Sequence, residues 1–271
     1  MKHRLPFSAL LYIAVFGIIC IAAVFAPVIG PYGETELVSD PWLSWNAQHL
    51  LGTDNLGRDM FTRLLYGTRN TIAIALAVAM LSFVLGVTMA FIAAVMGGWV
   101  DQMISRVVDV LMSIPTLIFA LVMLSVLGTS VPVLILVMAI LESTLFFRIA
   151  RPLAVDVIAC EYVETARLRG EGLWWFLRRE ILPNVAPTLV AEFGLRFSFS
   201  ALFVSSLSFL GLGIQPPHAD LGGLVRENVN AITFGLGVPL VPAVMIALVT
   251  ISVNGIVDYF VHRYSIRAEV L

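Results

Sequence analysis

The densest group of charged side chains in this chain lies between residues 161 and 184. The segment begins Glu161-Tyr-Val-Glu-Thr-Ala-Arg-Leu-Arg-Gly170 and runs on to Ile181-Leu-Pro-Asn184. The segment has no nucleophile beside a base and no metal-ligand spacing, so catalysis and metal binding are not indicated. Its arginines and glutamates instead suit ion pairing with another surface. Such a charged stretch cannot lie in the hydrocarbon of a membrane. We therefore interpret it as a loop that docks a soluble partner.

The rest of the chain offers little chemistry of its own. Its only lysine is Lys2, which excludes a P-loop, because that motif needs a lysine to hold the terminal phosphates. The sequence contains no HExxH or CxxC motif and no Ser/His/Asp cluster. None of the four histidines has metal-ligand spacing: His3, His49, His218 and His262. We expect no catalytic residue, metal site or cofactor on this chain. If the chain takes part in an ATP-driven process, the ATPase is a separate polypeptide.

Three of the ionisable side chains within long apolar runs are of particular interest. Glu142 lies in the run 137–147, whereas Glu192 and Arg196 are four residues apart in the run 188–212. Charges inside a membrane are costly and usually face a cavity or a partner. These residues either line a cavity between helices, or Glu192 and Arg196 form an ion pair within one helix and Glu142 reaches the membrane interface.

The composition identifies a membrane protein. Hydrophobic residues make up 59% of the 271 residues and charged residues 13%, with a mean hydropathy of +0.96, whereas a soluble domain has about 25% charged residues. Apolar runs long enough to cross a membrane predict an all-α polytopic protein with six transmembrane helices. The predicted spans are 5–28 (an uncleaved first helix), 71–97, 107–127, 131–148, 188–212 and 237–261.

The basic residues predict the orientation. With the N-terminus inside, eleven Lys and Arg residues fall on the cytoplasmic side and four on the outer side. We therefore expect both termini and the loop 149–187 in the cytoplasm, and the loops 30–70 and 213–236 outside. The four outer residues are Arg58, Arg63, Arg69 and Arg226.

The charged segment itself reads as two short helices. The pattern predicts helices over Glu161–Leu168 and 173–181, separated by a backbone reversal at Gly170. Pro183 is expected to end the second helix and Pro187 to mark re-entry into the membrane.

Two interpretations of these helices stay open. Ala166 and neighbouring small side chains project into a partner cleft, with Trp174, Trp175 and Phe176 forming an aromatic face. Alternatively, the segment is an amphipathic interfacial helix whose arginines reach to the membrane surface without a partner.

Three blocks of sequence carry a resemblance to a known family. Glu164-Thr-Ala166, Gly170 and Ile181-Leu-Pro183 resemble the EAA…G…I-LP signature of ABC-transporter permease subunits, at the spacing of the dipeptide/oligopeptide/nickel branch. The outer segment of that branch is similar to Leu51-Gly-Thr-Asp-Asn-Leu-Gly-Arg-Asp59 with Arg63-Leu-Leu-Tyr-Gly67, and its fifth-helix exit to Ser208-Phe-Leu-Gly-Leu-Gly-Ile-Gln-Pro-Pro217. The resemblance extends from the first helix to Arg267.

The sequence departs from the family pattern at a few positions. Thr165 replaces the middle alanine of the signature. Glu142 and Ser143 stand where relatives often carry an aromatic residue, and Val204 stands where many carry a glutamate. The last three positions fall in membrane helices, so they bear on the substrate rather than on the ATPase surface.

The resemblance implies a type I ABC importer permease fold with a cytoplasmic coupling helix. Residues 1–70 would form the first transmembrane helix and a periplasmic loop, and residues 71–271 a five-helix core that includes the coupling loop 149–187. The implied ATPase-coupling residues are Glu164, Thr165, Ala166, Arg167, Gly170, Leu173 and Trp174. The candidate substrate-path residues are Glu142, Glu192 and Arg196.

The implied function is import of peptides or related small solutes across a bacterial inner membrane. The partners would be a homologous second permease, two ATPase subunits that hold ATP and Mg, a periplasmic substrate-binding protein and membrane lipid, with no nucleic acid. The alternative is a self-contained secondary carrier or a membrane enzyme subunit. A carrier should show internal repeats and broken helices, and a haem-binding subunit should show histidines inside its spans.

Overall fold

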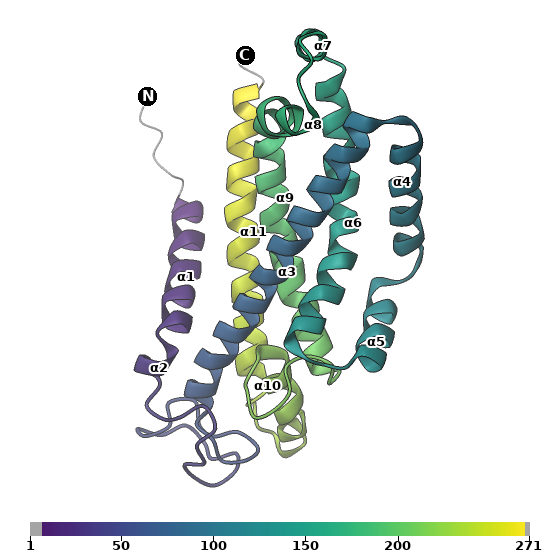
Figure 1. Cartoon of the computed structure of the whole chain (residues 1–271). Coiled ribbons are helices and arrows are strands. Elements are labelled where there is room, and N and C mark those ends of the chain that lie inside the picture. Colours follow the sequence, from purple (N-terminus) through teal and green to yellow (C-terminus); the bar gives the residue numbers. More distant parts are fainter. Residues whose placement is uncertain (1–6, 269–271) are drawn as a thin grey trace.

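The protein is an elongated bundle of helices that run mostly along its long axis (Figure 1). A computed structural model describes residues 7–268, without the side chains of residues 164, 165, 167, 173 and 263–268. Five helices are long and apolar enough to cross a membrane, and a bent pair makes a sixth span, as predicted. The spans are α1 (Phe7–Val24), α3 (Met60–Met96), the pair α4 (Gly98–Ser113) and α5 (Thr116–Leu127), α6 (Val131–Ile158), α9 (Leu182–Phe209) and α11 (Leu240–Ala268).

Shorter elements gather at the two ends of the bundle (Figure 1). One end, which we call the α7 end, carries α7 (Glu161–Leu168) and α8 (Leu173–Trp175) together with the start of α1 and the end of α11. The opposite end, the cap end, holds residues 30–59 and 210–239. Its helical elements are α2 (Ala26–Ile29), α10 (Leu221–Asn228) and the 3-10 helix η2 (Val229–Phe234).

The most extensive helix contact is between α3 and α6, and it is permitted by a glycine. A Cβ added at Gly86 would overlap the carbonyl oxygen of Ser143 and lie 2.6 Å from the Cβ of Phe146. Phe83, one turn earlier on α3, meets Phe146 edge to face with ring centroids 5.4 Å apart. Membrane helices associate largely through such close packing, because lipid provides no hydrophobic drive between them.

The second span begins earlier than predicted. α3 starts at Met60 rather than at residue 71, because Asp59 caps it by accepting a hydrogen bond from the backbone N–H of Thr62 at 2.8 Å. Arg63 and Arg69 therefore belong to the helix and not to an outer loop.

The third span is not one straight helix over 107–127. α4 and α5 are bent by 89° at a break between Ser113 and Thr116. Pro115 is the physical reason, because it disfavours helical geometry in the preceding residue, and Ile114 is extended with φ −95° and ψ 131°.

The fifth span also differs from the prediction. The π-helix η1 (Phe176–Ile181) continues directly into α9, so neither Pro183 nor Pro187 interrupts the chain. Pro183 lies in the first turn of α9, where its missing N–H costs little, and Pro187 is tolerated inside the helix, as prolines in membrane helices are.

The α3–α6 crossing yields a first prediction. Gly86→Ala should destabilise the protein by about 1–3 kcal/mol, because the added methyl group overpacks a closed contact. We expect a lower thermal midpoint in detergent, measured as the monodisperse fraction after heating. Gly17→Ala in α1 is the matched control, since a Cβ there meets nothing within 4 Å. Equal midpoints for the two variants would contradict the argument.

Candidate functional site

The charged segment folds at the α7 end into the helix and turn that its sequence predicts. α7 spans Glu161–Leu168, and its first turn is closed by the backbone N–H of Val163, which donates to the carbonyl of Cys160 at 3.0 Å. The chain reverses at Gly170, whose φ of +79° lies in the left-handed region that favours glycine. The predicted first helix and the reversal after it are confirmed.

The inner face of α7 packs onto the bundle. Val163 and Ala166 are fully buried and form a small apolar cluster with Phe176, against which Val95 of α3 and Val157 of α6 also pack. The expectation that Ala166 projects into a partner cleft is therefore wrong for this chain. Its small side chain instead lets α7 lie close to Phe176.

The three consecutive aromatic residues do not share a face. Trp174 is 71% exposed, whereas Phe176 is buried and Trp175 lies between them in exposure. Trp175 meets Phe176 edge to face at 5.7 Å, and the guanidinium of Arg169 lies 5.7 Å from the Trp175 ring. Adjacent helical residues point in different directions, so the predicted common aromatic face is wrong.

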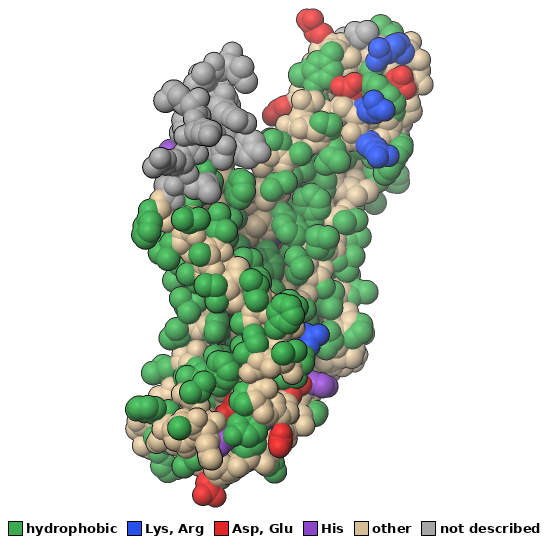
Figure 2. Space-filling view, turned by 90° about the vertical axis from the view of Figure 1, so that its left-hand side faces the viewer, with side chains coloured by type: hydrophobic (Ala, Val, Ile, Leu, Met, Phe, Trp, Pro, Cys, Tyr) green, Lys and Arg blue, Asp and Glu red, His purple; other side chains and the backbone are tan. Residues whose placement is uncertain are grey.

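The outer face of the α7 end combines apolar and charged side chains. Figure 2 shows basic and acidic side chains gathered at this end, above a flank that is mainly hydrophobic. Leu168 is 85% exposed, and Tyr162 and Trp174 are exposed with it. Arg169, Arg178 and Arg179 are exposed on the same segment. The side chains of the expected coupling residues Glu164, Thr165, Arg167 and Leu173 lie outside the described residues.

The α7 end is firmly joined to the membrane helices. Leu177 and Ile181 of η1 are buried in a cluster that contains Phe91 of α3 and Phe147 of α6. Nearby, Arg151 of α6 forms a bidentate ion pair with Asp101 of α4, with two hydrogen bonds of 2.5 Å. The α7 end is therefore in continuous side-chain contact with α3 and α6.

The three candidate substrate-path residues come together in the middle of the bundle. Glu192 and Arg196 form the predicted ion pair within α9. Glu142 lies halfway along α6 and is 5% exposed, so it does not reach the membrane interface as the alternative interpretation had it. Glu142 and Arg196 line one cavity of about 210 Å³.

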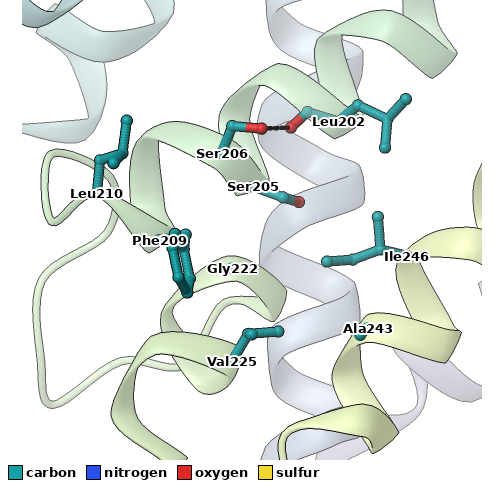
Figure 3. Close-up of a pocket in the computed structure, with 9 residues that line it drawn as sticks. All are labelled: Leu202, Ser205, Ser206, Phe209, Leu210, Gly222, Val225, Ala243 and Ile246. Atoms are coloured by element: carbon teal, nitrogen blue, oxygen red, sulfur yellow. Dashed lines mark hydrogen bonds between the residues drawn. The ribbon is translucent and has the colours of Figure 1, made fainter. Parts of the chain in front are cut away.

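A larger cavity of about 450 Å³ lies near the cap end between α9, α10 and α11 (Figure 3). Its lining is mainly apolar, and its two serines are satisfied within their own helix. Ser205 and Ser206 each donate to a carbonyl one turn earlier at 2.8 Å. These serines are helix-packing residues, as small polar residues in membrane helices often are.

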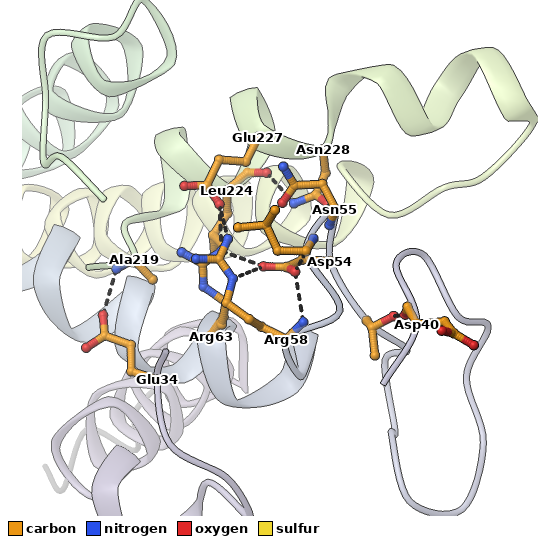
Figure 4. Close-up of polar contacts among 12 residues, drawn as sticks. Glu34, Asp40, Asp54, Asn55, Arg58, Arg63, Ala219, Leu224, Glu227 and Asn228 are labelled. Carbon is orange, nitrogen blue, oxygen red and sulfur yellow. Dashed lines mark hydrogen bonds and ion pairs between the residues drawn. The ribbon is translucent and has the colours of Figure 1, made fainter. Parts of the chain in front are cut away.

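The sequence analysis missed a buried ion-pair network at the cap end (Figure 4). Asp54 Oδ2 accepts from Arg58 Nε and from Arg63 Nη1, both at 2.6 Å. Glu227 Oε2 of α10 accepts from the same two arginines at 2.8 and 2.6 Å. Arg63 and Asp54 are fully buried. The spacing of Asp54 and Arg58 by four residues was the only local signal, because Glu227 is remote in sequence.

The network joins the loop 30–59 to α10. Further contacts reinforce the joint, since the backbone N–H of Asn55 donates to Asn228 Oδ1 at 3.0 Å and that of Ala219 donates to Glu34 Oε1 at 2.6 Å. Burial alone raises the pKa of Asp54. Hydrogen bonds from the amides of Arg58 and Leu56 and from the Arg63 guanidinium outweigh burial, so the pKa lies below its ordinary value. Asp54 is thus held ionised at neutral pH.

Within residues 7–268 as described, no three His, Cys, Asp or Glu side chains are placed to hold a metal ion. What the structure offers is an exposed, mixed surface at one end, a buried polar cavity in the membrane and a rigid cap at the other end.

Comparisons with known proteins find a matching family and similar transport permeases. Residues 82–266 match the family described as binding-protein-dependent transport system inner membrane component. The glutathione transport system permease protein GsiD of Pectobacterium atrosepticum is 32% identical over 209 residues, or 77% of this chain and 69% of that protein. The dipeptide transport system permease protein DppC of Alkalihalophilus pseudofirmus is 30% identical over 259 residues, or 95% and 84%.

A solved structure shares the fold. An amino acid ABC transporter with histidines is similar over 75% of this chain and 94% of that chain, with a TM-score of 0.52 and 19% sequence identity. The predicted permease fold is therefore confirmed.

The cap network yields a second prediction. Asp54→Asn should destabilise the protein by about 1.5–3 kcal/mol at neutral pH, because two buried guanidinium groups lose one of the two carboxylates they share and keep only Glu227. Since the folded pKa is lowered, this contribution is present above the ordinary value of 3.8 and is lost as the pH falls through the folded value. Thermal unfolding in detergent measures the loss. Asp40→Asn, at an exposed position in the same loop, should leave the midpoint unchanged.

Proposed function

Because the chain belongs to the family of binding-protein-dependent transport system inner membrane components, we propose that it works as one half of the translocation path of an ATP-driven importer. The other half would be a homologous second permease. The chain itself is a permease component of the peptide-transporter type, as its relatives are. The proposed cargo is a peptide or a related small solute.

The observation that carries the coupling proposal is the two-faced α7 end. Its inner face is packed through Ala166 and Phe176 onto α3 and α6, and its outer face exposes Leu168 and Trp174. An exposed apolar surface rimmed by charge is typical of a protein interaction site. In this proposal each of two ATPase subunits, which hold ATP and Mg, docks on the α7 end of one permease.

Transport then follows from a change between two packings. Closure of the ATPase pair moves α7, and the buried cluster around Phe176 carries the movement to α3 and α6. Packed cores shift between discrete arrangements rather than deforming continuously, so a small displacement at α7 becomes a movement of whole helices. A periplasmic substrate-binding protein delivers cargo at the cap end.

The proposed location is the bacterial inner membrane, with the α7 end in the cytoplasm. Two observations support this orientation. Arg148, Arg151, Arg169, Arg178 and Arg179 lie at or near the α7 end, in agreement with the positive-inside rule. At the cap end, Arg58 and Arg63 are paired with the buried Asp54 and the partly buried Glu227, so they add little free positive charge.

The rival function is a self-contained carrier or a membrane enzyme subunit. The two readings differ in what the chain needs to be active. Purification from membranes in mild detergent separates them, because ATPase subunits that co-purify support the importer, whereas uptake by the lone chain in vesicles supports the carrier.

The coupling proposal yields a third prediction. Trp174→Ala should reduce recovery of ATPase subunits with the purified permease by weakening their binding about 30-fold, because truncating a central interface tryptophan typically costs about 2 kcal/mol. Trp45→Ala is the matched control, since Trp45 is 80% exposed at the cap end and should leave that recovery unchanged. Equal recovery from both variants would remove Trp174 from the interface.

The orientation yields a fourth prediction. In a Cys20→Ser/Cys160→Ser background, a membrane-impermeant maleimide added to spheroplasts should label a cysteine at Glu36 but not one at Glu171. Both positions carry a glutamate in the native chain, at the cap end and the α7 end respectively. Labelling at Glu171 alone would invert the topology.

A further inference from the structure

The cavity that contains Glu142 is built from four helices in the middle of the bundle. Its volume is about 210 Å³. Pockets that enclose a whole small molecule are about 300–1,000 Å³, so this cavity suits one chemical group rather than an entire cargo. Its lining comes from the break between α4 and α5, from α6 and from α9, and consists of Leu111, Met112, Thr116, Leu141, Glu142, Thr144, Leu145, Arg196, Phe199 and Phe203.

Glu142 carries an unused hydrogen-bonding atom in this cavity. The residue is only 5% exposed. Its Oε2 has no hydrogen-bond partner among the described residues. A buried polar atom without a partner is unfavourable, and more so when it is charged. A carboxylate retained only for packing would be expected to have its oxygens satisfied.

The nearby cation is already engaged. Arg196 donates from Nε to Glu192, and its guanidinium lies 5.5 Å from the centre of the Phe199 ring. Two carboxylates thus face one guanidinium, and one of the carboxylates has a free oxygen. The three side chains therefore carry one more negative group than positive ones.

We propose that this cavity binds a cationic group of the cargo, an ammonium or a guanidinium, and that Glu142 accepts its hydrogen bond. The inference rests on the proposed function, because it places the cavity on the translocation path. Phe203 lines the same cavity and offers an aromatic face, which also attracts cations. Arg196 is the positioning residue that keeps Glu192 neutralised, so that Glu142 alone sets the charge preference.

The test measures the charge preference of the cavity in the assembled transporter. Thr116→Cys, in the Cys20→Ser/Cys160→Ser background, places one thiol in the cavity lining. The thiol is treated with methanethiosulfonates that carry an ethyltrimethylammonium or an ethylsulfonate group, with and without a non-hydrolysable ATP analogue. We expect the cationic reagent to react about tenfold faster than the anionic one, after normalisation to a free thiol in solution.

Glu142→Gln should remove this preference, because it retains the shape of the side chain and deletes its charge. Glu142→Asp should keep most of it. Asp258→Asn is the matched control, since Asp258 is an exposed carboxylate of α11 outside the cavity lining, and it should leave the ratio unchanged. Thr144→Cys provides a second reporter position if the first variant fails to assemble.

A second readout tests binding directly. Argininamide should slow the reaction of neutral methyl methanethiosulfonate with Thr116→Cys when Glu142 is present, and should not do so in Glu142→Gln. Equal rates for the two charged reagents would overturn the inference, as would a preference for the anionic reagent, which would indicate that a cation of the partner permease fills the cavity. No reaction in either nucleotide state would also overturn it, since a cargo group could not enter.

The outcome is separable from that of the proposed function. Uptake that depends on ATP and on the binding protein tests the importer itself. A transporter with such uptake but no charge preference at the cavity would refute only the cation site, whereas loss of both would refute the importer as well.

Discussion

The close approach of α3 and α6 at Gly86 is the constraint on which the rest of the molecule depends. The contact leaves no room for a methyl group beside the Ser143 carbonyl, so the two helices have a fixed crossing. α3 then extends to both ends of the bundle. Its first turns carry Arg63 into the cap network, and its last turns pack Val95 against the α7 cluster. One helix of 37 residues therefore connects the cap with the α7 end.

The position of the cavity follows from this crossing. Glu142 directly precedes Ser143, the residue whose carbonyl faces Gly86. A rigid movement of the α3–α6 pair therefore moves Glu142 relative to α9, which carries Glu192 and Arg196. The bend at Pro115 places the break between α4 and α5 in the cavity lining, because a straight third span would place different side chains there. In the proposed mechanism, α6 both receives the push at α7 and lines the cargo-facing cavity.

Sequence reasoning found the parts of this structure that local composition determines. Apolar runs predicted the spans, and the charge density with Gly170 predicted α7 and its turn, because a membrane excludes such groups whatever the tertiary fold. It did not find the features that depend on distant partners. Ala166 is buried because Phe176 packs over it. Pro187 is tolerated because it lies inside a membrane helix. Arg63 is paired because the fold brings Glu227 of α10 next to it. None of these partners could be identified from spacing along the chain.

The cap network has a consequence for how the protein is made. Asp54, Arg58 and Arg63 belong to an early part of the chain, whereas Glu227 follows Arg63 by 164 residues. During synthesis the two arginines share only Asp54 until the fifth span has been inserted and α10 has been delivered to the same side. The cap therefore closes late, after most helices are in place. Until then the two arginines outnumber the one carboxylate they share, so an excess positive charge stays near the start of α3.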